Sequence, residues 1–119
     1  MMTFIWYPKC STCKKIKDWL DEQAYEYELR DIMTDTPTAD ELADWHKRSG
    51  LPFSRFCNSS GDLYRKLGLK DKLANMSLED QYKLISQDGY LIRRPILVTD
   101  TTVLVGSRIP EWEKTLAAN

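Results

Sequence analysis

Residues 3–13 have the sequence TFIWYPKCSTC, in which an apolar run ends at a proline and a Cys-x-x-Cys pair follows. The apolar run predicts a buried strand over residues 2–7. Apolar side chains at helical spacing in the next stretch predict an amphipathic helix over residues 12–23. Cys10 and Cys13 therefore lie in the turn between a first strand and a first helix. A thiol pair at that place is typical of redox chemistry rather than of packing.

The position of the pair predicts different roles for its two sulfurs. A cysteine reacts as its thiolate, and a helix N-terminus with nearby lysines (Lys9, Lys14 and Lys15) favours that charged form. Cys10 should lie at the exposed end of the loop and act as the attacking thiol. Cys13 should lie one turn inside the helix, where lower accessibility suits a resolving thiol.

Two other interpretations of the pair remain open, namely small buried side chains or a zinc site. A structural zinc site needs four ligands, and the sequence offers only Cys57 and His46 besides the pair, far away and without a second pair spacing. We therefore expect no metal. Cys57 is expected to be a buried or half-buried free thiol, and His46 to be a surface or packing residue.

Composition narrows the class of protein further. A chain of 119 residues with 42% hydrophobic and 29% charged residues fits one globular domain spanning residues 1–119. The net charge of −1 lacks the basic excess of a direct nucleic-acid binder. No apolar run is long enough for a membrane span, and no secretory signal pattern is present. A cytoplasmic location is expected, and the odd count of three cysteines argues against a disulfide-stapled scaffold.

The remaining patterns predict helices in the middle of the chain and strands near its end. Alternation over residues 25–30 predicts a second strand, which a crossover helix should make parallel to the first. Three helices in the middle should begin at Thr38, Asn58 and Ser77 and end near Gly50, Gly68 and Gly89. Residues 95–99 and 102–106 predict an antiparallel hairpin, and residues 110–116 a last helix.

Three motifs in this order resemble the arsenate reductase and Spx-like family. They are Trp6–Cys13 (WYPKCSTC), Tyr64–Leu69 (YRKLGL) and Leu91–Ile96 (LIRRPI). The resemblance covers essentially the whole chain and implies an α/β, thioredoxin-like fold. That fold would have a four-stranded mixed sheet, with a helical insertion at about residues 34–90 between a βαβ unit and a ββα unit.

The resemblance also implies residues around the thiol. Cys10 would be the attacking thiol, Arg94 would bind an oxyanion beside it, and the Arg94–Pro95 peptide bond would be cis, with Pro95 structural near the site. Reductases of this family that depend on glutathione and glutaredoxin carry three arginines around the oxyanion. The other two positions fall at Asn58 and Gly106 here. Arg55 and Arg108 are the nearby arginines that could take their place, while Arg93 is expected to face away, toward the surface or a partner.

Two functions of different classes follow. The first is a thiol–disulfide oxidoreductase that resembles arsenate reductases, acts on a small oxyanion or a disulfide, and closes a Cys10–Cys13 disulfide. It would need no bound cofactor, only a thiol-recycling donor such as thioredoxin, or glutaredoxin with glutathione. The alternative is an Spx-like redox-responsive transcriptional regulator that binds the RNA polymerase α subunit. Neither involves direct contact with nucleic acid or a membrane.

Overall fold

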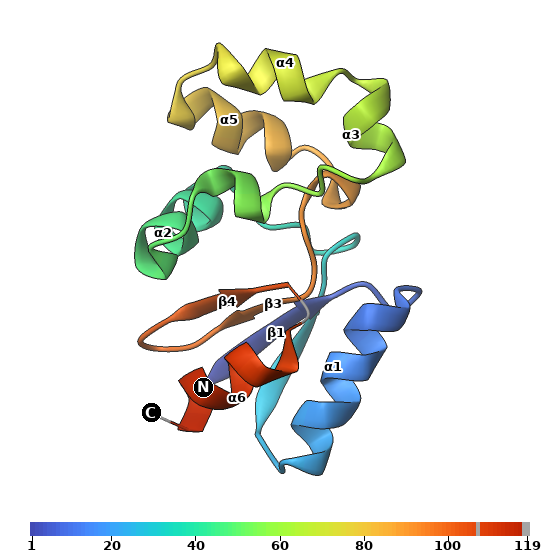
Figure 1. Ribbon diagram of the computed structural model, residues 1–119, viewed down its shortest axis with the longest axis vertical. Coiled ribbons are helices and arrows are strands. Elements are labelled where there is room, and N and C mark those ends of the chain that lie inside the picture. Colours follow the sequence, from blue (N-terminus) through green and yellow to red (C-terminus); the bar gives the residue numbers. More distant parts are fainter. Residues whose placement is uncertain (107, 118–119) are drawn as a thin grey trace.

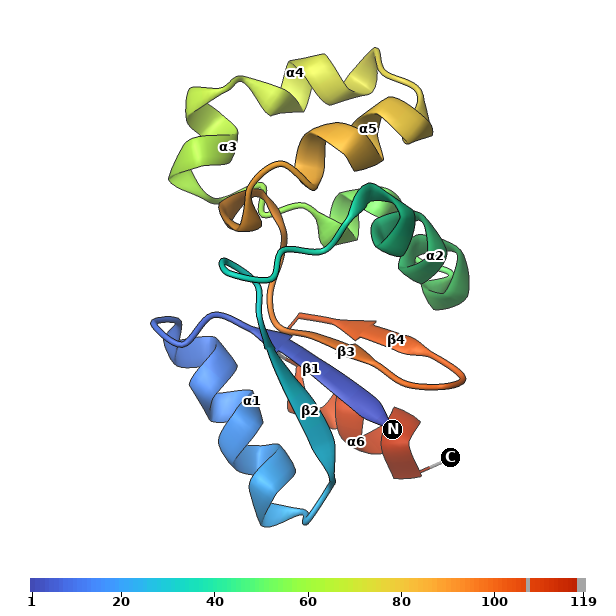
Figure 2. The same cartoon turned by 180° about the vertical axis from the view of Figure 1, so that it is seen from behind.

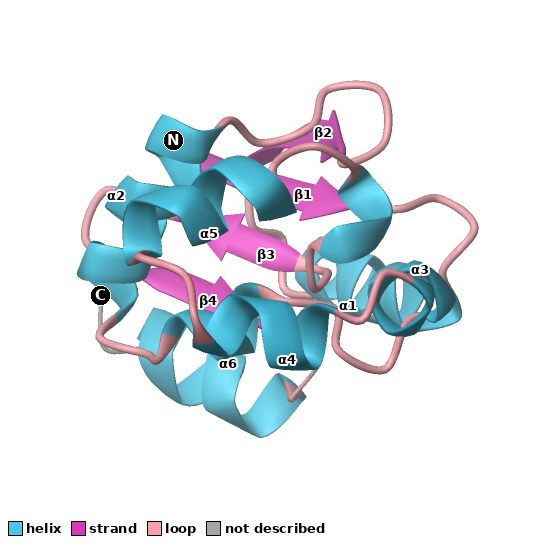
Figure 3. Cartoon of the chain, turned by 90° about the horizontal axis from the view of Figure 1, so that it is seen from above, coloured by secondary structure: helices cyan, strands magenta, loops and turns pink. Residues whose placement is uncertain are grey.

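A four-stranded mixed sheet forms the centre of the computed structural model, which describes residues 1–106 and 108–117. The strands are β1 (Met2–Trp6), β2 (Tyr27–Asp31), β3 (Ile96–Val98) and β4 (Val103–Val105), in the order β2-β1-β3-β4. β1 is parallel to β2, and β3 is antiparallel to both β1 and β4. Figure 3 shows this order beneath the helices. The predicted βαβ unit and the antiparallel hairpin are confirmed, and the predicted strand ends differ by one or two residues.

Successive residues of β1 serve two different cores because strand side chains alternate between the faces of a sheet. Phe4 faces a core that it forms with α1 (Ser11–Glu22) and α6 (Ile109–Ala117). Ile5 faces the opposite core, beneath the helices that lie between β2 and β3. In Figures 1 and 2 α1 and α6 therefore lie below the sheet, and the other four helices lie above it. No helix of the described residues is long and apolar enough to cross a membrane.

The segment between β2 and β3 holds four α-helices and two short 3-10 helices among the described residues. The α-helices are α2 (Ala39–Ser49), α3 (Asp62–Lys66), α4 (Leu69–Ala74) and α5 (Leu78–Ile85), and the 3-10 helices are Phe53–Phe56 and Gly89–Leu91. The sequence patterns missed α4 and placed the start of α3 too early. Gly68 explains the first error: its φ of +65° ends one helix and begins the next, so one residue serves both.

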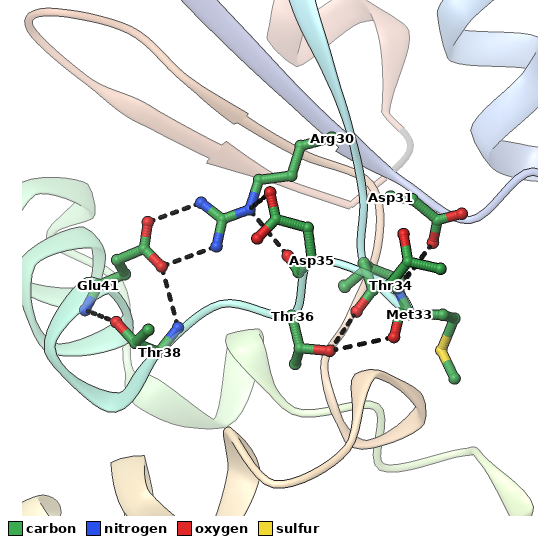
Figure 4. A network of polar contacts seen from close by, with 9 residues as sticks. Arg30, Asp31, Met33, Thr34, Asp35, Thr36, Thr38 and Glu41 are labelled. Atoms are coloured by element: carbon green, nitrogen blue, oxygen red, sulfur yellow. Dashed lines mark hydrogen bonds and ion pairs between the residues drawn. The ribbon is translucent and has the colours of Figure 1, made fainter.

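The start of α2 is fixed by an ion pair to the sheet. Thr38 and Glu41 form the predicted capping box, with bonds of 3.1 and 3.0 Å between each side chain and the other residue's backbone N–H. Arg30 of β2 donates to both oxygens of Glu41, at 2.6 and 2.7 Å (Figure 4). This guanidinium holds the pKa of Glu41 at about 2. The first inserted helix is therefore anchored directly to an edge strand.

A short ladder ties the far end of the insertion to the strand that follows it. Cys57 and Ile92 form an isolated antiparallel bridge. The Asn58 N–H donates to the Leu91 carbonyl at 2.9 Å, and the Arg93 N–H donates to the Phe56 carbonyl at 2.9 Å. Residues 55–58 consequently lie beside residues 91–94, just before β3. The ladder brings a piece of the insertion to the end of the sheet where α1 begins.

Candidate active site

Cys10 is the N-cap residue of α1. β1 ends at Trp6, and the chain then turns back so that the Cys10 N–H donates to the Tyr7 carbonyl at 2.9 Å. The Cys10 carbonyl accepts from the Lys14 N–H at 3.1 Å and so opens the helix. The thiol therefore lies where the first N–H groups of a helix have no intrahelical partner. Its sulfur is 3.0 Å from the Thr12 hydroxyl oxygen.

The pKa of Cys10 is lowered to about 7 by its hydrogen bonds. Partial burial raises this pKa, but donors from the Thr12 hydroxyl, the Cys13 backbone and thiol, and the Arg94 side chain outweigh that effect. The expected lowering is thus found, and the expected donor from the helix N-terminus contributes through the Cys13 backbone. The nearby lysines Lys9, Lys14 and Lys15 are solvent-exposed, and the hydrogen bonds act in their place.

Cys13 differs from Cys10 although it lies only three residues further along. Its side chain is fully buried, one turn inside α1, as the sequence predicted. Burial raises its pKa to about 12, and the neighbouring Cys10 adds to the rise. The Cys13 thiol is also within hydrogen-bonding reach of Cys10. The pair therefore combines an acidic, accessible thiol with a weakly acidic, sheltered one.

The Cys10 thiol opens into a cavity of about 640 Å³. Arg55, Arg94 and Arg108, the three arginines singled out from the sequence, all line it. Its full lining is Cys10, Thr12, Arg55, Asn58, Ser60, Arg93, Arg94, Val105, Gly106, Arg108 and Glu111. The lining thus contains the four guanidinium groups of its arginines and only one carboxylate, that of Glu111, so the charge of the cavity favours anions.

Arg94 lines this cavity from a position two residues before β3. Its Nε and Nη1 atoms are buried and have no hydrogen-bond partner among the described residues. The Arg94–Pro95 peptide bond is cis, as the resemblance implied. The Pro95 carbonyl accepts from the Gly106 N–H at 3.0 Å, which brings the loop after β4 to the same cavity. An anion beside Cys10 would supply the acceptors that the guanidinium lacks.

Arg55 and Arg108, the two arginines that the sequence offers near the other family positions, both line the cavity. Arg55 lies in the first 3-10 helix of the insertion, and Arg108 lies just before α6. Asn58 and Gly106 line the cavity too, so each arginine stands close to the position where the family pattern places one. The Asn58 amide donates to the Tyr90 carbonyl at 3.0 Å and so fixes the loop.

Sequence reasoning was wrong about Arg93 and missed Thr12. Arg93 lines the cavity beside Arg94 instead of facing away, because the ladder to Phe56 fixes its backbone and no regular strand imposes alternation there. Its Nε is also buried without a partner among the described residues. Thr12 could have been recognised, since a hydroxyl two residues after a helix-capping thiol lies within reach of the sulfur.

Cys57 and His46 occupy packed positions, as expected. The Cys57 thiol is buried, donates to the Phe53 carbonyl at 3.6 Å, and has a pKa raised to about 11 by burial. His46 Nδ1 lies 2.6 Å from the Tyr82 hydroxyl within an aromatic cluster. Within residues 1–106 and 108–117, no three His, Cys, Asp or Glu side chains gather in a way that could hold a metal.

Comparison with known sequences finds relatives over nearly the whole chain. Residues 5–115 match the model of the ArsC family. The Bacillus subtilis protein YusI is 41% identical over 116 residues, which are 98% of each chain. The global transcriptional regulator Spx of Staphylococcus epidermidis is 30% identical over 106 residues, covering 89% of this chain and 79% of the regulator.

Comparison with solved structures also finds proteins related to arsenate reductases. The ArsC family related protein of Bacteroides fragilis superposes with a TM-score of 0.91 at 47% identity, over 95% of each chain. The possible arsenate reductase of Streptococcus mutans superposes with a TM-score of 0.87 at 42% identity, over 95% of this chain and 98% of that one. The thioredoxin-like fold is thereby confirmed. With its matching sequence model, relatives and structures, the chain belongs to the ArsC family.

Proposed function

We propose that the protein is a thiol-dependent reductase in which Cys10 attacks and Cys13 resolves. One observation carries this proposal: a thiol with a pKa of about 7 faces an arginine-lined cavity, while a second thiol is buried next to it. At pH 7 about half of the Cys10 side chains would be thiolate, compared with a few per cent for an ordinary cysteine.

The first step is nucleophilic attack by the Cys10 thiolate. With a disulfide substrate, the sulfur–sulfur bond breaks, one half leaves as a thiolate, and the other half forms a mixed disulfide with Cys10. With arsenate, the sulfur displaces one oxygen, which leaves as water after protonation, and a Cys10–arsenic(V) bond forms. Arg94, Arg55 and Arg108 would hold the anionic substrate because guanidinium groups make charge-assisted hydrogen bonds to oxyanions.

The second step is attack by Cys13 on the Cys10 sulfur. A Cys10–Cys13 disulfide forms as the bond between Cys10 and the substrate breaks. From the mixed disulfide, the remaining half of the substrate leaves as a thiolate with the electron pair of that bond. From the arsenic adduct, the electron pair stays on arsenic and reduces arsenic(V) to arsenic(III). Cys13 must first lose its proton. The negative charge of Cys10 raises the pKa of Cys13, so consumption of that charge in the adduct favours this loss, although burial still opposes it.

An external dithiol would then reduce the disulfide and complete the cycle. Thioredoxin, or glutaredoxin with glutathione, is the proposed donor, and no bound cofactor is part of the scheme. The proposal includes a cytoplasmic location, where such donors keep thiols reduced.

A steady-state assay with arsenate tests the enzyme proposal. Thioredoxin with its reductase and glutaredoxin with glutathione are supplied in turn, and Cys10→Ser and Cys13→Ser are compared with the parent protein. Cys10→Ser should abolish turnover. Cys13→Ser should stall after the first step and accumulate a Cys10 adduct visible by intact mass. Full activity of Cys10→Ser would refute the proposal.

A second candidate function is supported by the Spx relatives. In this reading the chain is a redox-responsive regulator that binds the RNA polymerase α subunit, and the Cys10–Cys13 disulfide shifts its affinity. A pull-down with the C-terminal domain of the α subunit, using oxidised and reduced protein, tests it. Absence of binding in both states would rule out this function, and binding that depends on the redox state would favour it over the reductase.

A further inference from the structure

Two tyrosine rings flank the guanidinium of Arg94. The Arg94 Cζ atom lies 5.1 Å from the ring centroid of Tyr7 and 6.0 Å from that of Tyr90, both within the range of a cation–π contact. The two rings meet edge to face, with centroids 5.7 Å apart and planes at 82°. Their hydroxyl oxygens are 3.1 Å apart. The rings and the guanidinium thus form one contact group.

The three members of this group come from distant parts of the chain. Tyr7 directly follows β1 and precedes the Cys10 turn, Tyr90 lies in the second 3-10 helix of the insertion, and Arg94 precedes β3. Tyr90 is held at its backbone, where its N–H donates to Asp88 at 2.9 Å and its carbonyl accepts from Asn58 at 3.0 Å. Tyr90 as a whole residue remains 42% exposed, so burial in a core does not account for its position.

Ring contacts hold a guanidinium in a way that an acidic partner would not. A carboxylate would occupy the N–H donors and cancel the positive charge. An aromatic face attracts the cation without accepting its in-plane hydrogen bonds. The Nε and Nη1 atoms of Arg94 are buried and have no partner in the described part of the chain, as this arrangement requires. The charge and the donors both remain available to the cavity.

We propose that Tyr7 and Tyr90 are positioning residues that form an aromatic clamp, in which both rings pack against the Arg94 guanidinium and aim its free donors at the Cys10 sulfur and at an anion bound there. This inference rests on the proposed function only in taking Cys10 as the reacting thiol. The clamp gives the contact between the insertion and the sheet a role. The insertion supplies Tyr90, and the end of β1 supplies Tyr7.

Alkylation of Cys10 tests the clamp without any need for turnover. Iodoacetate carries a negative charge and iodoacetamide carries none, so the ratio of their rates reports the positive charge aimed at the sulfur. The rates are measured by peptide mass spectrometry on Tyr90→Ala, Tyr90→Phe and Arg94→Gln, and on Tyr90→Ala combined with Arg94→Gln. Tyr25→Ala is the matched control, because Tyr25 contacts Trp19 and follows the opposite end of α1.

The clamp predicts a specific pattern. Tyr90→Ala should lower the ratio about threefold to tenfold, the factor expected for loss of one guanidinium–ring contact. Tyr90→Phe keeps the ring and should stay within about twofold of the parent, and Tyr25→Ala should not change the ratio. In the Arg94→Gln background, Tyr90→Ala should cause no further loss, since it acts only through Arg94.

Several results would overturn the clamp. The clamp would be wrong if the ratio of iodoacetate to iodoacetamide rates stayed unchanged in Tyr90→Ala, or if Tyr90→Phe lost as much as Tyr90→Ala. It would also be wrong if Tyr90→Ala lowered the ratio equally in the Arg94→Gln background, or if the parent ratio were no higher than that of Arg94→Gln. None of these depends on reductase activity. If the alkylation rates show the pattern of the clamp but the protein reduces no substrate, the reductase proposal is wrong and the clamp proposal stands.

Discussion

The turn that holds Cys10 and the bridge that holds Cys57 each place a thiol close to an arginine, yet the two thiols differ in acidity. Burial raises the pKa of both. At Cys10, hydrogen bonds from the Thr12 hydroxyl and the first turn of α1 reverse that rise and bring the pKa to about 7. At Cys57 the charge of Arg93 only opposes it, and the pKa stays at about 11. Donors aimed at the sulfur therefore decide reactivity, and a nearby positive charge alone does not.

The largest expected effect is in the labelling rates of these two thiols. A pKa difference of 11 − 7 = 4 corresponds to about 10⁴-fold more thiolate at Cys10 near neutral pH. Iodoacetamide at pH 7 should therefore label Cys10 and leave Cys57 unmodified, as read by peptide mass spectrometry. In denaturant the two thiols should react at similar rates. Comparable labelling in the native protein would break the comparison.

A smaller effect separates the stability of the insertion from the chemistry of the turn. Glu41→Gln keeps the cap but removes the ion pair with Arg30, which should cost about 1–2 kcal/mol in urea unfolding, a factor of roughly 5–30. Native Cys10 should alkylate at its usual rate. Glu79→Gln, which removes an exposed pair to Lys83, is the control and should cost little.

The same ion pair predicts a pH dependence of stability. The pKa of Glu41 is lowered from 4.5 to about 2 in the folded protein, mainly by its hydrogen bonds to Arg30. The stabilisation is therefore complete above about pH 4.5 and is lost as the pH falls toward 2. Unfolding curves between those values should show the parent protein approaching Glu41→Gln. A difference that stays constant down to pH 2 would contradict this assignment.

Thr12→Val tests the hydrogen bond that distinguishes the two thiols. Loss of the hydroxyl should raise the pKa of Cys10 and slow its alkylation at pH 7 by roughly threefold to tenfold. At pH 9.5, where both proteins are mostly thiolate, the rates should converge. Ser11→Ala, a neighbouring exposed hydroxyl, should leave the profile unchanged. Equal profiles for Thr12→Val and the parent would shift the explanation to the helix terminus alone.

The smallest effect is expected at the buried thiol. Cys57→Ala should change the rate of Cys10 alkylation by less than about twofold, because Cys57 does not line the cavity and contacts Phe53 instead. The readout is the pH profile of alkylation, which separates a change in pKa from loss of folded protein. A change of more than about threefold in the Cys10 alkylation rate would show that the Cys57–Ile92 bridge and the Cys10 turn are energetically coupled.

The sequence by itself determined the order of the strands, the first two helices and the last helix, and the place of the Cys10–Cys13 pair at the start of the first helix. The period of two in strands, the period of 3.6 in helices and the capping residues are local properties, so β1, α1 and α2 could be predicted within a residue or two. The contrast in burial and pKa between Cys10 and Cys13 likewise follows from their places relative to one helix terminus. Local signals failed at Gly68, which lies between two short helices and caps the second one.

The tertiary structure decided which of the side chains from distant parts of the chain meet around Cys10. Arg55, Arg93 and Arg108 come from three separate segments of the chain, and the Tyr7–Tyr90 pair joins residues 83 positions apart. Such meetings depend on the ladder at Cys57 and Ile92 and on the sheet order, neither of which a periodic pattern encodes. Arg93 shows the limit most clearly, because an alternation rule fails where the backbone belongs to an isolated bridge. Local periodicity fixes which face a side chain takes within its element, whereas long-range packing fixes which elements meet.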